Sequence, residues 1–288
     1  VARFYGYDKI EPTLAAGTPT VGKRSRSQII TAMVKQNMLS SGLCEAMTFS
    51  FESPKVFDKL NIAKDSDLRK TVTISNPLGE DYSVMRTTTL NAMLTSLATN
   101  YNRRNESAGL FEIGKVYLPK AVPVVELPDE ISTLTIGMYG NMDFYDIKGI
   151  VEKMFEMLGM SEKVEYATEK NIAHMHTGRT ASICVEGKQF GYVGELHPQI
   201  ASNYGIGTKV YIAVINMPEV IAYADLVKEY KALPKFPAVT RDIAMVVSED
   251  VTVKQIENVI KQNAGQYLES VKLFDVYQGK QIGKGLKS

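Results

Sequence analysis

Cysteine is scarce in this sequence and long apolar runs are missing, and both absences exclude whole classes of protein. Cys44 and Cys184 lie far apart and form no CxxC pair, which argues against a disulfide framework or a zinc ribbon and fits a reducing cytoplasm. No run approaches the roughly 20 apolar residues of a membrane span, and residues 1–10 lack the charged and apolar regions of a signal peptide. We therefore expect a cytoplasmic protein without a membrane segment.

Net charge is also nearly absent. The chain carries 33 basic and 32 acidic residues, a formal charge of +1, so no overall field points to nucleic acid. Residues 231–288 are slightly basic, with nine basic and six acidic side chains. With 44% hydrophobic residues among 288, the chain can bury one large core of roughly 200 residues and form a small second domain.

Hydrophobic periodicity predicts helices and strands in irregular alternation. Helices are expected at 25–43, 56–60, 89–103, 147–158, 218–224 and 253–263. Strands are expected at 44–51, 71–75, 82–85, 110–118, 132–139, 164–167, 180–185, 190–196, 210–217, 240–247 and 268–277. A tight turn at 186–189 predicts an antiparallel hairpin, and the irregular order favours an α+β fold over a doubly wound parallel sheet.

The strongest linker signal is the proline-rich stretch 233–237. The segments after it, at 240–247, 253–263 and 268–277, predict strand, helix and strand. This order is the first half of a ferredoxin-like split βαβ unit.

Motifs of catalysis are missing: the sequence has no Walker A, GxSxG, HExxH or GxGxxG pattern. The residues that come nearest to a metal site are His174, His176, His197 and Glu195, which could together offer zinc three imidazoles and a carboxylate. The alternative, which we favour, places His174 and His176 in a loop before a strand and makes His197 the cap of the helix that Pro198 begins.

Two further groups of charged residues have both a functional and a structural interpretation. Arg86, Arg103, Arg104 and Glu112 could form a clamp for phosphate or carboxylate, although arginines at a helix C-terminus also simply complement its dipole.

The acids Asp143, Asp146, Glu152 and Glu156 could act as general acid and base, although a four-residue spacing on a helix is more typical of a solvated face. The lysines after residue 231 are interleaved with Tyr267, Phe274 and Tyr277. They could bind RNA through phosphate contacts and base stacking, or form an ordinary surface.

Eight segments of the sequence resemble, in order, landmarks of the bacterial phenylalanine–tRNA ligase β subunit, and they extend over essentially the whole chain. They are ARFYGYDKI, NPLGEDYSVMRTTTL, LFEIGKVY, DFYDIKG, HTGRTASI, GELHPQI, KFPAVTRDIAMVV and LFDVYQG. The chain starts without methionine and stops as a strand begins, so we expect a C-terminal fragment of that subunit.

The resemblance implies a domain order. Residues 1–13 are similar to the tail of a preceding domain, 14–225 to a non-catalytic core with the class II synthetase antiparallel sheet, 226–230 to a linker, and 231–288 to part of a ferredoxin-fold anticodon-binding domain. The missing third strand of that domain would lie between the first two, so their backbone groups would be left unpaired and the domain mobile or paired by other residues.

The resemblance also implies the function. The whole enzyme attaches phenylalanine to its tRNA using ATP and magnesium, as an α2β2 heterotetramer, whereas this chain supports the α subunit and contacts tRNA. We expect no catalytic residue, no metal ligand and no bound cofactor in it. The candidate tRNA-binding residues are Lys235, Arg241, Lys280, Lys284 and Lys287.

Departures from the class II motifs support an inactive core. Residues 114–118 resemble the motif 2 strand in which an arginine grips the ATP α-phosphate, but Leu118 occupies that place, and no glycine-rich third motif ending in arginine follows. Without these cations the charge that develops during adenylate formation would lack stabilisation. The family usually has a longer stretch between Asn141 and Met142, so a loop is expected to be missing there. The alternative function is a protein-interaction scaffold of class II-like fold without a tRNA role.

Overall fold

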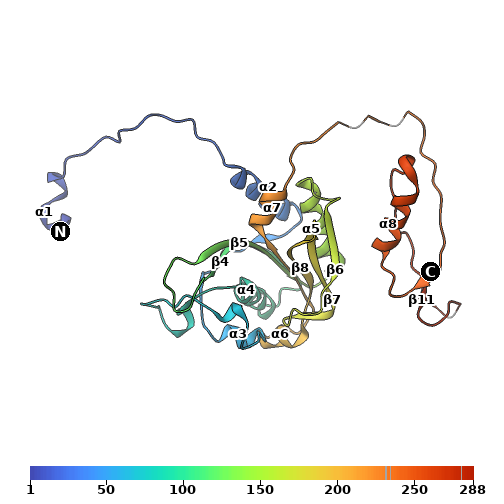
Figure 1. Cartoon of the computed structure of the whole chain (residues 1–288). Coiled ribbons are helices and arrows are strands. Elements are labelled where there is room, and N and C mark those ends of the chain that lie inside the picture. The colour runs from blue at the N-terminus through green and yellow to red at the C-terminus, as the bar shows by residue number, and fades with distance from the viewer. Residues whose placement is uncertain (231, 234, 280) are drawn as a thin grey trace. The chain divides into compact units, whose positions relative to one another are not determined.

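The computed structural model describes residues 1–230, 232–233, 235–279 and 281–288. The chain divides into two compact units, residues 1–229 and 230–288, and Figure 1 shows both. Each unit is described by itself below.

Unit 1 is built on a seven-stranded sheet with the order β1-β4-β5-β9-β8-β7-β6. Its strands are β1 (Cys44–Glu45), β4 (Ala108–Leu118), β5 (Asp129–Tyr139), β6 (Val164–Thr168), β7 (Met175–Val185), β8 (Lys188–Leu196) and β9 (Val210–Asn216). All neighbours pair antiparallel except β1, which runs parallel to β4. The predicted α+β class with an antiparallel sheet is therefore confirmed.

Helices cover both faces of this sheet (Figure 1). One face packs against α2 (Arg26–Ser40), α5 (Phe144–Met157) and α7 (Met217–Tyr223). The other face packs against α3 (Val56–Lys59), α4 (Leu90–Asn102) and α6 (Pro198–Asn203). Because strand side chains alternate between faces, β4 sends Phe111 into the first core and Leu110 towards the second.

Local sequence signals account for the helix starts and the main hairpin. Ser25 and Asp143 begin α2 and α5 with capping boxes, and Pro198 stands in the first turn of α6. Between β7 and β8, Glu186 and Gly187 have φ values of 51° and 79°, the left-handed pair that a two-residue hairpin turn requires. The predicted hairpin at 186–189 is confirmed.

The segment 44–85 departs from its prediction. The expected strand at 44–51 is two short strands, β1 and β2 (Phe51–Glu52), and β2 pairs with β3 (Val84–Met85) in a separate two-stranded sheet, the β2–β3 sheet. The strand expected at 82–85 is confirmed as β3. The strand expected at 71–75 is reduced to an isolated bridge between Thr73 and Val84. Short 3-10 turns, Asp67–Arg69 and Glu80–Tyr82, occupy the remainder.

Before this sheet, residues 1–25 form only a short helix, α1 (Ala2–Tyr5), and a 3-10 turn (Tyr7–Lys9). Their side chains are almost all exposed. Within the described residues, no helix has the length and apolarity needed to cross a membrane.

Unit 2 forms less regular structure than its sequence predicts. Helix α8 (Val253–Asn263) has the predicted bounds and starts with a capping box at Thr252, and a 3-10 turn follows at Gly265–Tyr267. The predictions of strands at 240–247 and 268–277 are wrong. Among the described residues of this unit, β10 (Val247–Ser248) and β11 (Leu286–Lys287) are the only strands that pair, antiparallel, and Tyr277 and Ser288 exchange two backbone hydrogen bonds.

The physical reason is that a strand depends on a neighbour for its hydrogen bonds, whereas a helix satisfies its own. None of the described residues of unit 2 is buried, so no packed layer holds residues 240–246 and 268–276 in extended pairs.

Candidate functional site

A buried polar cluster lies on the sheet face that α4 covers. Glu112 of β4 points to this face, and Arg86, which follows β3, lies over it with its guanidinium Nη2 3.0 Å from the Glu112 carboxylate. Both side chains are at most 5% exposed. Gly114, two residues along β4, makes room for them, because a Cβ there would lie 2.1 Å from the Arg86 Nη2 atom.

Further hydrogen bonds to protein groups satisfy the donors and acceptors of this ion pair. Arg86 also donates from Nε to the Lys115 carbonyl (2.8 Å) and from Nη1 to the Thr48 hydroxyl (2.9 Å), and that hydroxyl donates to Glu112 (2.8 Å). Burying two charges costs free energy unless such bonds satisfy them. The cluster is therefore a structural clamp between β4 and the segment before β2, and it leaves Arg86 committed to protein groups.

The structure separates the other members of the proposed phosphate or carboxylate clamp. Arg103 caps the C-terminus of α4 and Arg104 follows it at φ 61°, both exposed. The interpretation as helix-end charges is confirmed for these two residues.

Glu52 is a second buried acid beside this cluster, and no sequence pattern predicted it. It is 4% exposed. Its Oε2 atom accepts from the Asn91 amide (3.2 Å), whose own oxygen accepts from the Tyr204 hydroxyl (2.8 Å). Burial raises the pKa of Glu52 to about 7, against the weaker opposing effects of the Asn91 hydrogen bond and the Arg86 charge.

Apolar and polar side chains alternate along residues 47–52, but the apolar ones face outward, which is the reverse of a strand that packs on a core. Met47, Phe49 and Phe51 are 90%, 71% and 38% exposed, whereas Thr48 and Glu52 point inward to Arg86 and Asn91. The edge of Tyr82 meets the Phe49 ring, with centroids 6.1 Å apart. An apolar set of side chains held outward by buried polar bonds is typical of a contact surface.

Apolar side chains fill the centre of the same sheet face. Leu90, Met93, Leu94 and Leu97 of α4 belong to the core cluster there. The helix lies directly on β5, because a Cβ at Gly137 would come within 2.9 Å of Met93 and Leu97. Leu118, which the resemblance aligns with an ATP-binding arginine, ends β4 and is half-buried.

The histidines and Glu195 each bond to a different group. His174 Nε2 lies 2.8 Å from the Tyr192 hydroxyl, and burial lowers the pKa of His174 to about 4. His176 accepts from the Gly178 amide, and His197 accepts from the Gln199 amide. In the described parts of the chain, no three or more His, Cys, Asp or Glu residues gather as metal ligands would.

The structural interpretation of the histidines, as loop residues and a helix cap, is correct only in part. His197 does cap α6, as predicted. His176 lies within β7 rather than in a loop before it, so that part of the prediction is wrong. Glu195 binds Arg179 at 2.8 and 3.1 Å, a bond that forms across the neighbouring strands β7 and β8.

The four acids considered for acid–base chemistry lie on the exposed side of α5. Asp143 and Asp146 make its capping box, and Glu152 and Glu156 pair with Lys148 and Lys153. They are exposed, which matches the solvated face that the spacing favoured.

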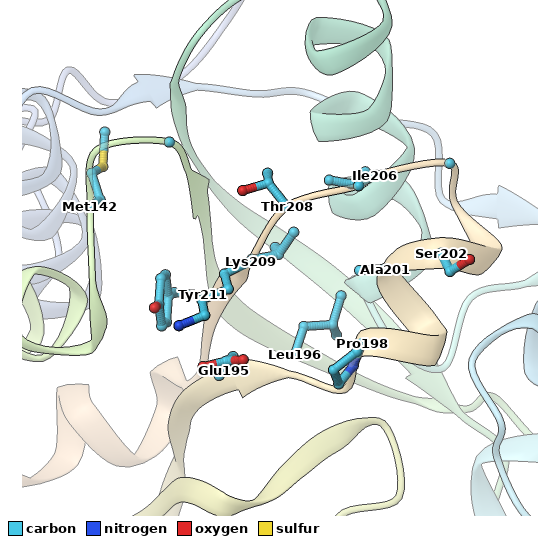
Figure 2. Close-up of a pocket in the computed structure, with 14 residues that line it drawn as sticks. Met142, Glu195, Leu196, Pro198, Ala201, Ser202, Ile206, Thr208, Lys209 and Tyr211 are labelled. Carbon is cyan, nitrogen blue, oxygen red and sulfur yellow. The ribbon is translucent and has the colours of Figure 1, made fainter.

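A groove of about 790 Å³ opens beside α6. Figure 2 shows its lining residues, with Glu195 and Tyr211 on one side and Pro198, Ala201 and Ser202 of α6 on another. The acid in its wall is already bound to Arg179. Ile206, Thr208 and Lys209, from the turn before β9, complete the wall (Figure 2).

The candidate tRNA-binding cations belong to unit 2, and the contacts of its described residues do not bring them together. Lys235, Arg241 and Lys284 are exposed, and Arg241 bonds only to the adjacent Thr240 carbonyl among the contacts of the described residues. Lys287 lies in β11 and donates to the Glu249 carbonyl (2.8 Å). Lys280 lies outside the described residues.

Two family profiles match this chain. Residues 10–217 match the "Phenylalanyl tRNA synthetase beta chain CLM domain", and residues 234–288 match the "Ferredoxin-fold anticodon binding domain".

Similar curated proteins extend over the whole chain. It is 49% identical to a phenylalanine–tRNA ligase β subunit of Clostridium acetobutylicum and 47% identical to one of Clostridium tetani. In each case the chain is matched completely and spans 36% of the relative. Both alignments are 288 residues long, whereas the alignment to the β subunit of Streptococcus thermophilus extends over 300 residues. The two clostridial relatives thus have no net insertion, and a longer loop at Asn141–Met142 in other relatives stays a prediction.

A solved structure resembles the core. Pyrrolysyl-tRNA synthetase from Desulfitobacterium hafniense superposes with a TM-score of 0.55 at 14% identity, over 68% of each chain. At this identity the likeness shows the fold alone, which is that of a class II-like synthetase sheet.

Proposed function

Because the chain belongs to the family of phenylalanyl-tRNA synthetase β chains, we propose that it is a non-catalytic part of a phenylalanine–tRNA ligase, supporting the α subunit and contacting tRNA. The ligase uses ATP and magnesium in the cytoplasm as an α2β2 assembly, and this chain itself binds no cofactor.

The observation that carries the non-catalytic role is the state of the β4 region. Leu118 stands where the class II motif 2 arginine is expected, at the end of β4. The buried Arg86 beside it gives its charge to Glu112 rather than to a ligand. A nucleotide phosphate would therefore meet neither of these positions as a free cation, and adenylate formation would lack electrostatic stabilisation.

The scaffold role is supported by the outward apolar set Met47, Phe49 and Phe51. Exposed apolar side chains in a fixed strand-like segment are suited to a protein partner. We propose that the α subunit covers this set.

Co-purification with the cognate α subunit tests the scaffold role. Light scattering should give the mass of a complex, and Phe49→Ser should weaken that complex at least tenfold. Leu127→Ser is the matched control, because Leu127 is 86% exposed in the β4–β5 connection, and it should leave binding unchanged. Failure of the wild-type chain to bind any α subunit would contradict the proposal.

A second candidate is a class II-like protein-interaction scaffold without a tRNA role. It is favoured by unit 2, where the contacts of the described residues do not gather the candidate cations into one patch. Binding of tRNA that weakens steeply with salt distinguishes the two functions, since phosphate contacts release counterions.

A further inference from the structure

Glu52 joins three elements that are distant in the sequence. It ends β2, where it is paired with Val84 of β3. Its Oε2 atom accepts from Asn91 in the first turn of α4, and Asn91 accepts from Tyr204 at the end of α6. The other carboxyl oxygen, Oε1, is buried and has no hydrogen-bond partner among the described residues. This carboxyl therefore lies between the β2–β3 sheet, α4 and α6.

The charges around Glu52 are engaged elsewhere. Arg86, after β3, is bound to Glu112 of β4. Lys59, at the end of α3, lies 3.7 Å from the centre of the Tyr204 ring, and Tyr204 of the α6 end is the remaining titratable group. An ionised Glu52 would thus be a buried charge with one neutral donor, Asn91, which is costly.

We propose that Glu52 is a proton-controlled latch, whose neutral carboxyl holds the β2–β3 sheet against α4 and α6 and whose ionisation loosens this sheet. The burial that raises the pKa of Glu52 to about 7 brings its titration into the physiological range. Strand β2 also carries Phe51, so the latch controls the rigidity of this member of the outward apolar set. The latch rests on these contacts and is independent of the proposed function.

Amide hydrogen exchange of the full chain tests the latch. Peptides that contain residues 51–52 and 84–85 are compared at pH 6 and pH 8.5, after correction for intrinsic exchange. A pKa that moves from 4.5 in the open β2–β3 sheet to about 7 in the closed one predicts that opening becomes about tenfold more frequent at pH 8.5. Peptides of α5 should show no such change.

Variants assign the effect to one carboxyl. Glu52→Gln should reduce the pH dependence of β2–β3 opening below twofold, whereas Glu165→Gln, which changes an exposed carboxyl of β6, should keep it tenfold. Opening of the wild-type β2–β3 sheet that does not depend on pH, or a Glu52→Gln chain with the full dependence, would overturn the proposal.

A direct titration keeps the test decisive if Glu52→Gln fails to fold. Carbon-13 spectra of the wild-type chain should contain one glutamate carboxyl that titrates near pH 7. In Asn91→Ala, which removes the hydrogen bond to the carboxylate, that midpoint should move upward. Titration of every glutamate below pH 5.5 would refute the latch.

Discussion

The two units of the chain differ in the burial of their apolar side chains. Unit 1 packs two apolar clusters, one on each face of its seven-stranded sheet. In unit 2 no described residue is buried, and Tyr267 and Phe274 are 87% and 74% exposed. A helix at residues 253–263 satisfies its own backbone hydrogen bonds, whereas the strands predicted on both sides of it need a neighbouring strand.

The largest expected effect concerns the buried ion pair of unit 1. Arg86→Met leaves the Glu112 carboxylate buried without its cation, so the free energy of unfolding should fall by about 3–5 kcal/mol. Urea denaturation of unit 1 measures this. Lys153→Met is the control, because its partner Glu156 is exposed, and it should change stability by less than about 0.5 kcal/mol. Equal effects of the two variants would contradict the assigned role of Arg86.

A matched truncation in each unit tests the comparison directly. Leu94→Ala in α4 removes a fully buried side chain and should cost about 2–5 kcal/mol. Val259→Ala in α8 removes a side chain that is 60% exposed, and should cost less than about 0.5 kcal/mol. The measurement is the urea midpoint of unfolding of each unit, monitored by hydrogen exchange. A large loss for Val259→Ala would show that unit 2 has a core of its own.

The buried His174 should make unit 1 less stable in acid. Because burial lowers the pKa of His174 to about 4, the unfolded chain takes up a proton first as pH falls below 6.5. Stability is therefore full above pH 6.5 and is lost as pH falls through 4, by up to about 3 kcal/mol. His174→Gln should remove this part of the acid-side slope in denaturation curves. An unchanged slope would contradict a buried, neutral His174.

The smallest expected effects are those of the candidate cations of unit 2 on tRNA binding. Arg241→Ala and Lys284→Ala should each weaken binding by about 1 kcal/mol and reduce the salt slope by about 0.9. Filter binding at several salt concentrations measures both quantities. Arg103→Ala in unit 1 is the control and should leave the slope unchanged. Loss of affinity without a change in slope would argue against phosphate contacts.

Sequence periodicity predicted the long elements because their signals are local. The strands at 110–118 and 132–139 and the helix at 89–103 were found within a few residues of β4, β5 and α4. The strand at 82–85 was also found, as β3. The division of 44–51 into β1 and β2 could not be predicted, because their partners are distant segments.

The buried polar cluster was predictable only in part. Arg86 and Glu112 were considered only as members of a possible phosphate or carboxylate clamp. Their pairing and burial depend on the space at Gly114, which no pattern reveals. Glu52 was missed because an apolar alternation usually points inward, and here its apolar side faces outward.

We propose that the class II-like sheet of this chain does not catalyse adenylate formation. The decisive measurement is phenylalanine-dependent exchange between ATP and pyrophosphate by the purified chain alone, with the α subunit complex as the positive control. We expect no exchange above buffer, because Leu118 and the paired Arg86 leave the β4 region without a free phosphate-binding cation at either position. Exchange that rises with phenylalanine concentration in the chain alone would contradict it.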